Sequence, residues 1–404
     1  MACVPRQLNL GTPTYITTPL GLVNNITSYP TITDTQYGNL IYINGYIYAA
    51  ISNSIYKFNA STYELISTTV IGTSSLTVSA YDPVNITLYI ASQAPAIVTL
   101  NVITNATTTI TNGVTGVPLA MVYNPADGNI YFTQTSGLYQ LNTSTQAITT
   151  IANPAAGNLF SIAIDPTTGY LWVISQVVIY VYTTSGTAIT TITPTGNPSM
   201  EQILYNPVTK DFYITGYSSN SMIVVNPATT SIIATVPVVY QPVNLTFDPL
   251  NNLIYILGLY SIGVFDPATN TYLGDIGLEG NLNILIFNPA TGDIVVAPNS
   301  GIPFTLIAIR PQVQSSRLVK AIVDLPVPVS VPAFYTQTNT VNVHAPSFAS
   351  ITAIEILSPV ITGEGLVQVT AMNNNNGTVT LNTSFNNPFI LNNKFRYLQV
   401  NLLW

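Results

Sequence analysis

Apolar residues along most of this chain fall in short runs that are separated by polar turn residues. Leu159–Ile164 is one such run; an Asp-Pro pair follows it, and then come two more runs, Tyr170–Ile174 and Val178–Tyr182. Apolar runs of this length, bounded by turn residues, are typical of buried β-strands. The pattern therefore predicts an all-β protein built from short strands.

The turn itself recurs at a nearly constant spacing. An Asp-Pro or Asn-Pro pair begins at six positions in steps of 42, 41, 41, 42 and 40 residues: Asp82, Asn124, Asp165, Asn206, Asp248 and Asn288. Seven residues after each stands a second column, which is aromatic except at its last member: Tyr89, Tyr131, Trp172, Tyr213, Tyr255 and Val295. Counting 41 residues back from Asp82 gives Ile41, which lacks the proline, yet Tyr48 follows it by seven. The sequence thus predicts seven repeats.

Each repeat contains enough turns for four strands. The Asp or Asn side chain is expected to cap its own backbone, proline fixes φ, and a following glycine such as Gly128 or Gly169 supplies a positive φ. A second turn follows about 18 residues later, as at Asn226-Pro227, and leads into a Thr- and Ile-rich fourth strand such as Ala147–Ile151. Four short strands per repeat are typical of a β-propeller blade. The alternative, an array of β-sandwiches, would show unequal strand spacing.

The blade pattern resembles the YVTN family of β-propeller repeats, which is found in archaeal surface-layer and other cell-surface proteins. The residues that carry the resemblance are the second strands and the turns after the third strands: Tyr89–Ser92, Tyr131–Gln134, Trp172–Ser175, Tyr213–Gly216, Val224–Thr229 and Val264–Thr269. It covers about three quarters of the chain. The resemblance implies a propeller architecture and says little about function.

The repeats divide the chain into three parts: an N-terminal tail (1–29), a seven-bladed propeller (30–332) and a small C-terminal domain (333–404). Thr14–Val23 is one candidate for a strand that closes the ring. The later strands of the seventh blade are expected at Phe304–Ile309 and Leu318–Val323. The proline-rich segment Leu325–Pro332 is expected to be a stiff linker.

The C-terminal domain lacks the repeat. Its alternating segments, such as Thr378–Asn382, predict a small β-sandwich-like fold. Charge also changes here, because five of the chain's eight cations follow residue 300. These cations are either ordinary solvated charges or a docking face for an acidic partner: Arg310, Arg317, Lys320, Lys394 and Arg396.

Composition narrows the surroundings in which this protein acts. Only 6% of the residues are charged, whereas about 25% is usual in soluble proteins. The hydrophobic share is 47%, yet no apolar run approaches the roughly 18 residues of a membrane-spanning helix, so a soluble protein with no membrane insertion is expected. With few carboxylates to protonate, such a chain suits an acidic exterior, although some Thr-rich β proteins simply have this composition. The first residues, Met1–Gln7, do not resemble a secretory signal peptide.

Residues with catalytic chemistry are sparse. The sequence has no nucleotide-binding loop, no nucleophile elbow and no zinc-protease motif. A single histidine, His344, and a single cysteine, Cys3, argue against a metal cage, a catalytic dyad or a disulfide framework. We therefore expect no enzyme activity, no cofactor and no metal. The net charge of −7 argues against nucleic-acid binding.

The innermost strands offer one set of candidate binding residues at the mouth of the central channel. Five residues before each Asp or Asn stand Thr77, Leu119, Phe160, Glu201, Val243 and Asn283. Only Thr77, Glu201 and Asn283 are polar, and Glu201 is the one carboxylate. A general acid–base pair needs two tuned groups.

These observations predict a non-enzymatic structural or attachment protein outside the cell. The first expectation is a virion surface component (a turret, spike or fibre head) of a virus of an acid-living archaeon, multimeric within an assembly. Its partners would be other structural proteins of a particle or surface layer and a host-surface glycan or protein. The alternatives are a cell-surface or surface-layer adhesion protein, and a propeller enzyme or small-ligand binder that acts at the channel mouth.

Overall fold

The computed structural model describes most of the propeller region and several strands beyond it. The described residues are 23–28, 32, 38–71, 75–135, 137–154, 158–277, 282–298, 304 and 306–312, and then 319–324, 330–331, 335–342, 353–356, 367–373, 378–385, 389–390 and 397–403. Val23–Gln312 forms one compact unit, and the strands after residue 312 belong to a second. The two units are described separately.

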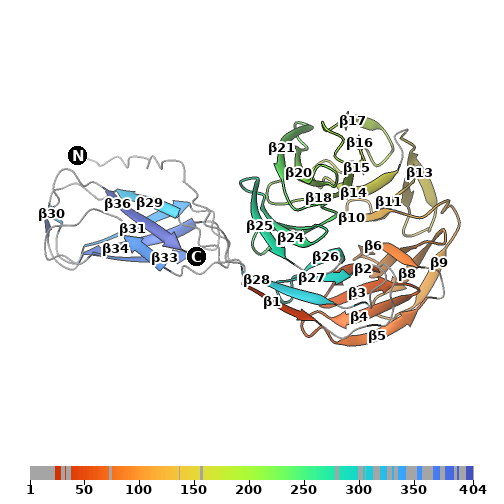
Figure 1. Ribbon diagram of the computed structural model, residues 1–404, viewed down its shortest axis with the longest axis horizontal. Coiled ribbons are helices and arrows are strands. Elements are labelled where there is room, and N and C mark those ends of the chain that lie inside the picture. The colour runs from red at the N-terminus through yellow and green to blue at the C-terminus, as the bar shows by residue number, and fades with distance from the viewer. Residues whose placement is uncertain are drawn as a thin grey trace. The chain divides into compact units, whose positions relative to one another are not determined.

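Val23–Gln312 contains seven four-stranded antiparallel sheets (Figure 1). Within each of the first six, the strands pair in chain order. These six are β2–β5 (Gly38–Ile43, Tyr46–Ile51, Ser54–Asn59, Leu65–Val70), β6–β9 (Leu76–Asp82, Thr87–Ser92, Ala96–Asn101, Thr107–Ile110), β10–β13 (Ala120–Asn124, Asn129–Gln134, Gly137–Leu141, Ile148–Ala152), β14–β17 (Leu159–Ile164, Leu171–Ser175, Ile179–Tyr182, Ala188–Ile192), β18–β21 (Met200–Tyr205, Phe212–Gly216, Ser221–Asn226, Ser231–Pro237) and β22–β25 (Asn244–Asp248, Leu253–Leu257, Ser261–Asp266, Thr271–Gly277).

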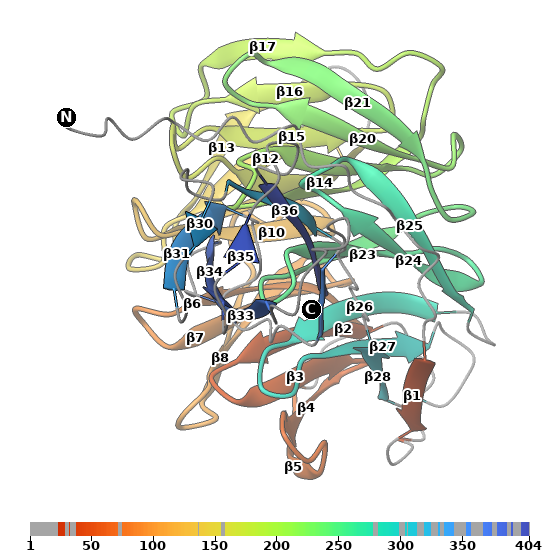
Figure 2. The ribbon, with the colours of Figure 1, turned by 90° about the vertical axis from the view of Figure 1, so that its left-hand side faces the viewer.

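The seventh sheet takes strands from both ends of this unit. It consists of β26 (Leu282–Asn288), β27 (Asp293–Pro298), β28 (Ile307–Gln312) and, as its outermost strand, β1 (Val23–Ser28). β1 pairs antiparallel with β28 from Val23 opposite Gln312 to Ser28 opposite Ile307, and the two lie side by side in Figures 1 and 2. The first strands of successive blades contact one another in a closed cycle, from β2 through β26 and back to β2. The protein is a seven-bladed β-propeller.

The predicted blade number is confirmed, but the strands at the ring's junction differ from the prediction. The closing strand is Val23–Ser28, whereas the sequence pointed to Thr14–Val23, of which residues 14–22 lie outside the described part. The strand expected at Leu318–Val323 as part of the seventh blade pairs elsewhere: β29 (Val319–Asp324) pairs with β36 (Tyr397–Leu403). Val23–Ser28 carries neither the turn nor the aromatic position that marks the repeats, so the sequence did not identify it as the partner of β28.

The first blade also differs in register from the simple count. Tyr48 pairs with Ile41, as Tyr89 pairs with Ala80, so Ile43 rather than Ile41 is the counterpart of Asp82. The strands are joined by Asn44 and Gly45, whose φ values of 47° and 86° are those of a tight hairpin turn. This blade reaches the same pairing with a turn two residues shorter.

The recurring Asp-Pro and Asn-Pro turns have the capped geometry that the sequence predicted. In all six, the side-chain Oδ1 accepts a hydrogen bond of 2.8–3.1 Å from the backbone N–H two residues later. Each of these six side chains is buried. Because every such turn follows the first strand of its blade, the turns lie together on one face of the ring.

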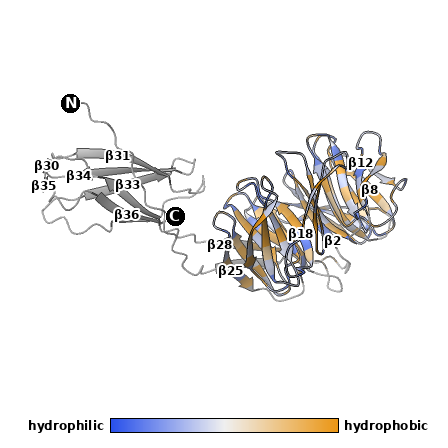
Figure 3. Ribbon diagram, turned by 90° about the horizontal axis from the view of Figure 1, so that it is seen from above, coloured by the Kyte–Doolittle hydropathy of each residue, from blue (hydrophilic) through white to orange (hydrophobic). Residues whose placement is uncertain are grey.

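The hydrophobic core is divided among the junctions between blades. One cluster joins the first and second blades, and others join the second to the third, the third to the fourth, the fourth to the fifth and the fifth to the sixth. At the junction of the fourth and fifth, Trp172 stacks on Phe212 with ring centroids 4.6 Å apart. Figure 3 shows apolar segments throughout the propeller rather than in one place. A blade therefore buries its faces only against its neighbours, and an open ring would leave two faces exposed.

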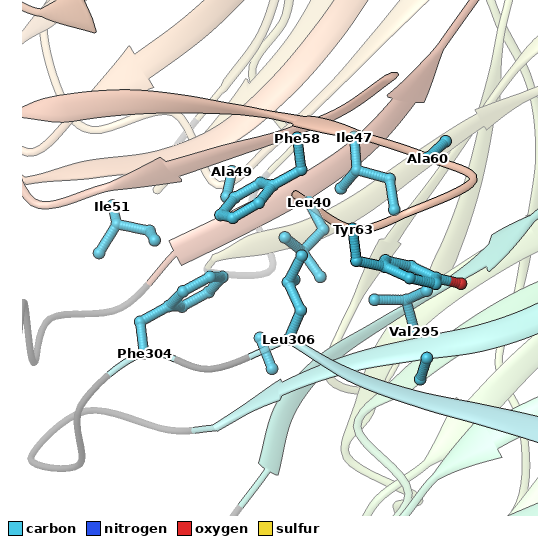
Figure 4. Close-up of a cluster of buried hydrophobic side chains, with 12 residues drawn as sticks. Leu40, Ile47, Ala49, Ile51, Phe58, Ala60, Tyr63, Val295, Phe304 and Leu306 are labelled. Carbon is cyan, nitrogen blue, oxygen red and sulfur yellow. The ribbon is translucent and has the colours of Figure 1, made fainter. Parts of the chain in front are cut away.

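The junction between the last and first blades is closed by an apolar cluster and a polar one. Leu40 and Phe58 of the first blade pack with Val295 and Leu306 of the seventh (Figure 4). Beside them the Tyr63 hydroxyl forms the centre of the polar cluster.

Tyr63 joins residues more than 220 positions apart in the chain. Its hydroxyl donates to Asp293 Oδ2 (2.7 Å) and accepts from Asn288 Nδ2 (2.9 Å). Asn288 Nδ2 also donates to the carbonyl of Ala60 (2.7 Å). Tyr63, Asn288 and Asp293 are all buried. Buried polar groups are costly unless they are hydrogen-bonded, so this cluster specifies which blade faces meet.

The second unit is described only as strands and their pairings. β29, β36 and β32 (Ala353–Ile356) form one sheet, and β31 (Tyr335–Asn342), β34 (Thr378–Phe385) and β33 (Val367–Asn373) form another. β30 (Ser330–Val331) pairs with β35 (Phe389–Ile390), so a strand pair occupies the end of the predicted linker. All the pairings are antiparallel. The packing of these sheets into a sandwich stays a prediction.

The junction cluster predicts a specific effect of removing one hydroxyl. Tyr63→Phe leaves the ring in place but deprives Asp293 and Asn288 of a partner in a buried site. We expect the free energy of unfolding to fall by about 1–3 kcal/mol. Thermal and denaturant unfolding of the full chain measure the change.

Tyr255→Phe is the matched control, because the Tyr255 hydroxyl is buried without a hydrogen-bond partner. This substitution should leave stability unchanged or raise it slightly. Equal losses in the two variants would contradict the assigned role of Tyr63.

Candidate functional site

The first strands of four blades are bulged near their N-terminal ends. The pairing register shifts between Leu76 and Ser79, Leu159 and Ser161, Met200 and Ile203, and Leu282 and Ile284. The residue five positions before the Asp or Asn falls inside each bulge: Thr77, Phe160, Glu201 and Asn283. Bulges re-aim side chains and are common beside binding sites. This ring of bulges, at the opposite ends of the first strands from the Asp-Pro turns, is the candidate site.

The structure places the three predicted polar residues at equivalent positions of different blades. Thr77 lies in the second blade, Glu201 in the fifth and Asn283 in the seventh, and all three are half-buried. The Thr77 hydroxyl donates to the carbonyl of Ala91 across its own blade (3.5 Å). Among the described side chains, no hydrogen bond joins any two of the three.

Glu201 is the one ionisable residue in the described ring of bulges. Burial raises the pKa of its carboxyl group, and burial is the only cause of that shift. Such a carboxylate accepts hydrogen bonds from hydroxyl or amide groups of a ligand. In the described part of the chain, no three His, Cys, Asp or Glu residues gather where they would hold a metal ion.

The predicted basic docking face falls mostly where side chains are not described. Arg310 lies on β28, opposite Asn25 of β1, and Lys320 lies on β29. Arg317, Lys394 and Arg396 lie outside the described residues, so this face stays a prediction.

Sequence reasoning missed a second polar column, four residues before the Asp or Asn. Ser161, Gln202 and Asn244 each accept a hydrogen bond from the backbone N–H of the next blade's first strand, at Ile203, Leu245 and Leu285 respectively. Asn39 of the first blade donates to Ser79 of the second in the same place (2.8 Å). The signal was present as polar residues inside otherwise apolar strands. These bonds tie neighbouring blades together around the axis.

Sequence reasoning also missed two exposed tyrosines on the face of the bulges. Tyr240 lies between β21 and β22, and Tyr260 lies between β23 and β24. The N–H of Leu259 donates to the carbonyl of Tyr240 (3.0 Å), so the two connections are adjacent. The chain has 25 tyrosines, and nothing in the sequence distinguishes these two from the buried ones.

Comparisons with known proteins leave the fold as the main guide to function. No family model matches this chain, and no curated protein matches it. The seven-bladed architecture is compatible with a propeller repeat family. Nowhere among the described residues is there a helix with the length and apolar character needed to cross a membrane.

Three carboxyl groups of the propeller make an unusual contribution to the pH dependence of its stability. Burial raises the pKa values of Glu201, Asp211 and Asp248, although hydrogen bonds from Asn226 to Asp211 and from residues 250–251 to Asp248 oppose it. The folded state therefore binds protons more tightly at these groups than the unfolded state does. Their contribution to stability is largest below the unfolded pKa values and is lost as the pH rises through the folded ones.

Because the stabilising contribution of these three carboxyl groups grows as the pH falls, we expect the protein to resist acid. We expect the melting temperature of the full chain to stay level or to rise as the pH falls from 7 to about 3, which is near the reference carboxyl pKa values. Glu201→Gln, which mimics the protonated side chain, should raise the melting temperature at pH 7 by a few degrees at most and leave it unchanged at pH 3. Thermal melts at several pH values measure both effects.

Glu64→Gln is the control, because Glu64 is an exposed carboxylate on the outer edge of the first blade. Its melting temperature at pH 7 should match that of the wild type, which separates the effect of burial at Glu201 from the loss of one negative charge. A drop of tens of degrees in the wild-type melting temperature at pH 3 would contradict the account.

Proposed function

We propose that this chain is a non-enzymatic structural and attachment protein displayed on an exterior surface in an acidic environment. The observation that carries the proposal is the scarcity of charged residues, which make up 6% of the chain. In the fold, the outermost strands of the blades form the rim of the ring, and they show the same scarcity of charge.

The described rim is almost free of ionisable groups. The outermost strands β5, β9, β13, β17 and β21 contain no Asp, Glu, Lys or Arg, and β25 contains one, Asp275. Their exposed positions are mostly Thr, Ser, Ile, Leu and Val. Such a surface changes little in charge when the pH falls, so acid neither creates repulsion nor breaks ion pairs on it.

Within this proposal, the exterior surface on which the protein is displayed is that of a virion (a turret, spike or fibre head of a virus of an acid-living archaeon). The resemblance of the blades to YVTN-type repeats supports an exterior role, and it equally supports the alternative of a cellular surface-layer or adhesion protein. The ring of bulges supports binding rather than acid–base catalysis, because it offers one carboxylate, Glu201, at the position where a catalytic pair would stand.

Electron microscopy of the native source with a gold-labelled antibody against the propeller tests the proposal. We expect label on intact, unpermeabilised surfaces, either on released particles or on the cell envelope; the first outcome selects the virion and the second the cellular alternative. Label that appears only after the cells are permeabilised would contradict an exterior function.

A further inference from the structure

We propose that the strand connections of the fifth and sixth blades, on the face of the bulges, bind a neutral carbohydrate chain through the rings of Tyr240 and Tyr260. The biological role of such a site rests on the proposed attachment function. The site itself is inferred from exposure, rigidity and the chemistry of the surrounding residues.

Tyr240 and Tyr260 are the two exposed aromatic residues of the described chain. Their exposed fractions are 55% and 67%, whereas the other described aromatic side chains are buried or half-buried. They lie on adjacent connections, held by the hydrogen bond from Leu259 N–H to the Tyr240 carbonyl. Two exposed tyrosines on adjacent connections, where the other described aromatic residues are buried or half-buried, indicate an interaction site.

The connections that carry the rings are held in place. The side chain of Asn220 accepts a hydrogen bond from the N–H of Gln241 (2.8 Å), which has a φ of 49° in the left-handed region. A Cβ atom on Gly258 would stand 2.7 Å from the Tyr240 carbonyl oxygen, so the backbone is tightly packed there. A rigid platform lowers the entropy lost on binding.

The residues around the two rings are polar and uncharged. The neighbouring connections, residues 194–199, 216–221, 237–243 and 258–261, contain no Asp, Glu, Lys, Arg or His. Ser218 and Ser219 are exposed there, and the Ser218 hydroxyl donates to that of Ser199 (2.8 Å). A ligand that matches aromatic faces and neutral hydrogen-bonding groups has apolar C–H faces and many hydroxyls, which describes a carbohydrate.

The size of the patch favours a small ligand over a protein partner. A tyrosine ring contributes roughly 150–250 Å² when fully buried. Two of them fall short of the roughly 800 Å² that each partner buries in a standard protein interface. The two rings alone are enough for a short carbohydrate, whereas a protein partner would need further contacts.

Titration of the full chain with neutral oligosaccharides tests the proposal. The probes are hexamers of glucose, mannose, galactose and N-acetylglucosamine, and binding is followed by calorimetry and tyrosine fluorescence. We expect at least one probe to bind, and the double variant Tyr240→Ala/Tyr260→Ala to weaken that binding by at least tenfold. Tyr240→Phe/Tyr260→Phe, which keeps both rings, should bind within about threefold of the wild type.

Val84→Ala is the matched control, because Val84 is an exposed apolar residue on the opposite face; it should bind like the wild type. No binding of any probe by the wild type, or equal binding by the double alanine variant, would overturn the proposal. A third arm uses an immobilised mannose-rich glycoprotein before and after periodate oxidation of its sugars, and binding that survives oxidation would show that the patch recognises polypeptide instead. A negative result here, with gold label still on the exterior, would reject the carbohydrate site and leave the attachment function standing.

Discussion

Closure of the ring, by the pairing of β1 with β28 and by the clusters between the seventh and first blades, is the constraint on which the rest of the propeller depends. The strand pairing joins Val23–Ser28 to Ile307–Gln312 and completes the seventh sheet from the two ends of the unit. Each blade buries apolar side chains only against its neighbours, so six junctions alone would leave two apolar faces in water. Closure at the seventh junction, with its apolar and Tyr63-centred clusters, removes both faces at once.

The same construction explains how a nearly uncharged chain remains specific. Hydrogen bonds fix the described turns and junctions: the Asp and Asn caps within blades, the Ser161, Gln202 and Asn244 side chains between them, and Tyr63 at the closure. Three carboxyl groups with raised pKa values add stability in acid. A surface made mainly of Thr, Ser and aliphatic residues can then face an acidic exterior, which is the basis of the proposed function.

Much of the fold was predictable from the sequence because the Asp/Asn-Pro column and the aromatic column repeat locally. The blade number and the turn geometry follow from them. The closing strand did not, because its partner lies almost 300 residues away and its own pattern is ordinary. The candidate site was predicted only as a position: the sequence found Thr77, Glu201 and Asn283, but the bulges, the inter-blade bonds of Ser161 and Gln202 and the exposure of Tyr240 and Tyr260 arise from three-dimensional packing.

Hydrogen exchange, followed by mass spectrometry on the full chain, tests the closure of the ring most directly. Closure by the N-terminal strand predicts that the amides of Val23–Ser28 that pair with β28, and the amides of Ile307–Gln312, are protected to a degree similar to those of β27, because β1 and β28 open together with the blade that they complete. Exchange of Val23–Ser28 at the rate of an unstructured peptide, while β27 and β28 remain protected, would contradict closure by the N-terminal strand.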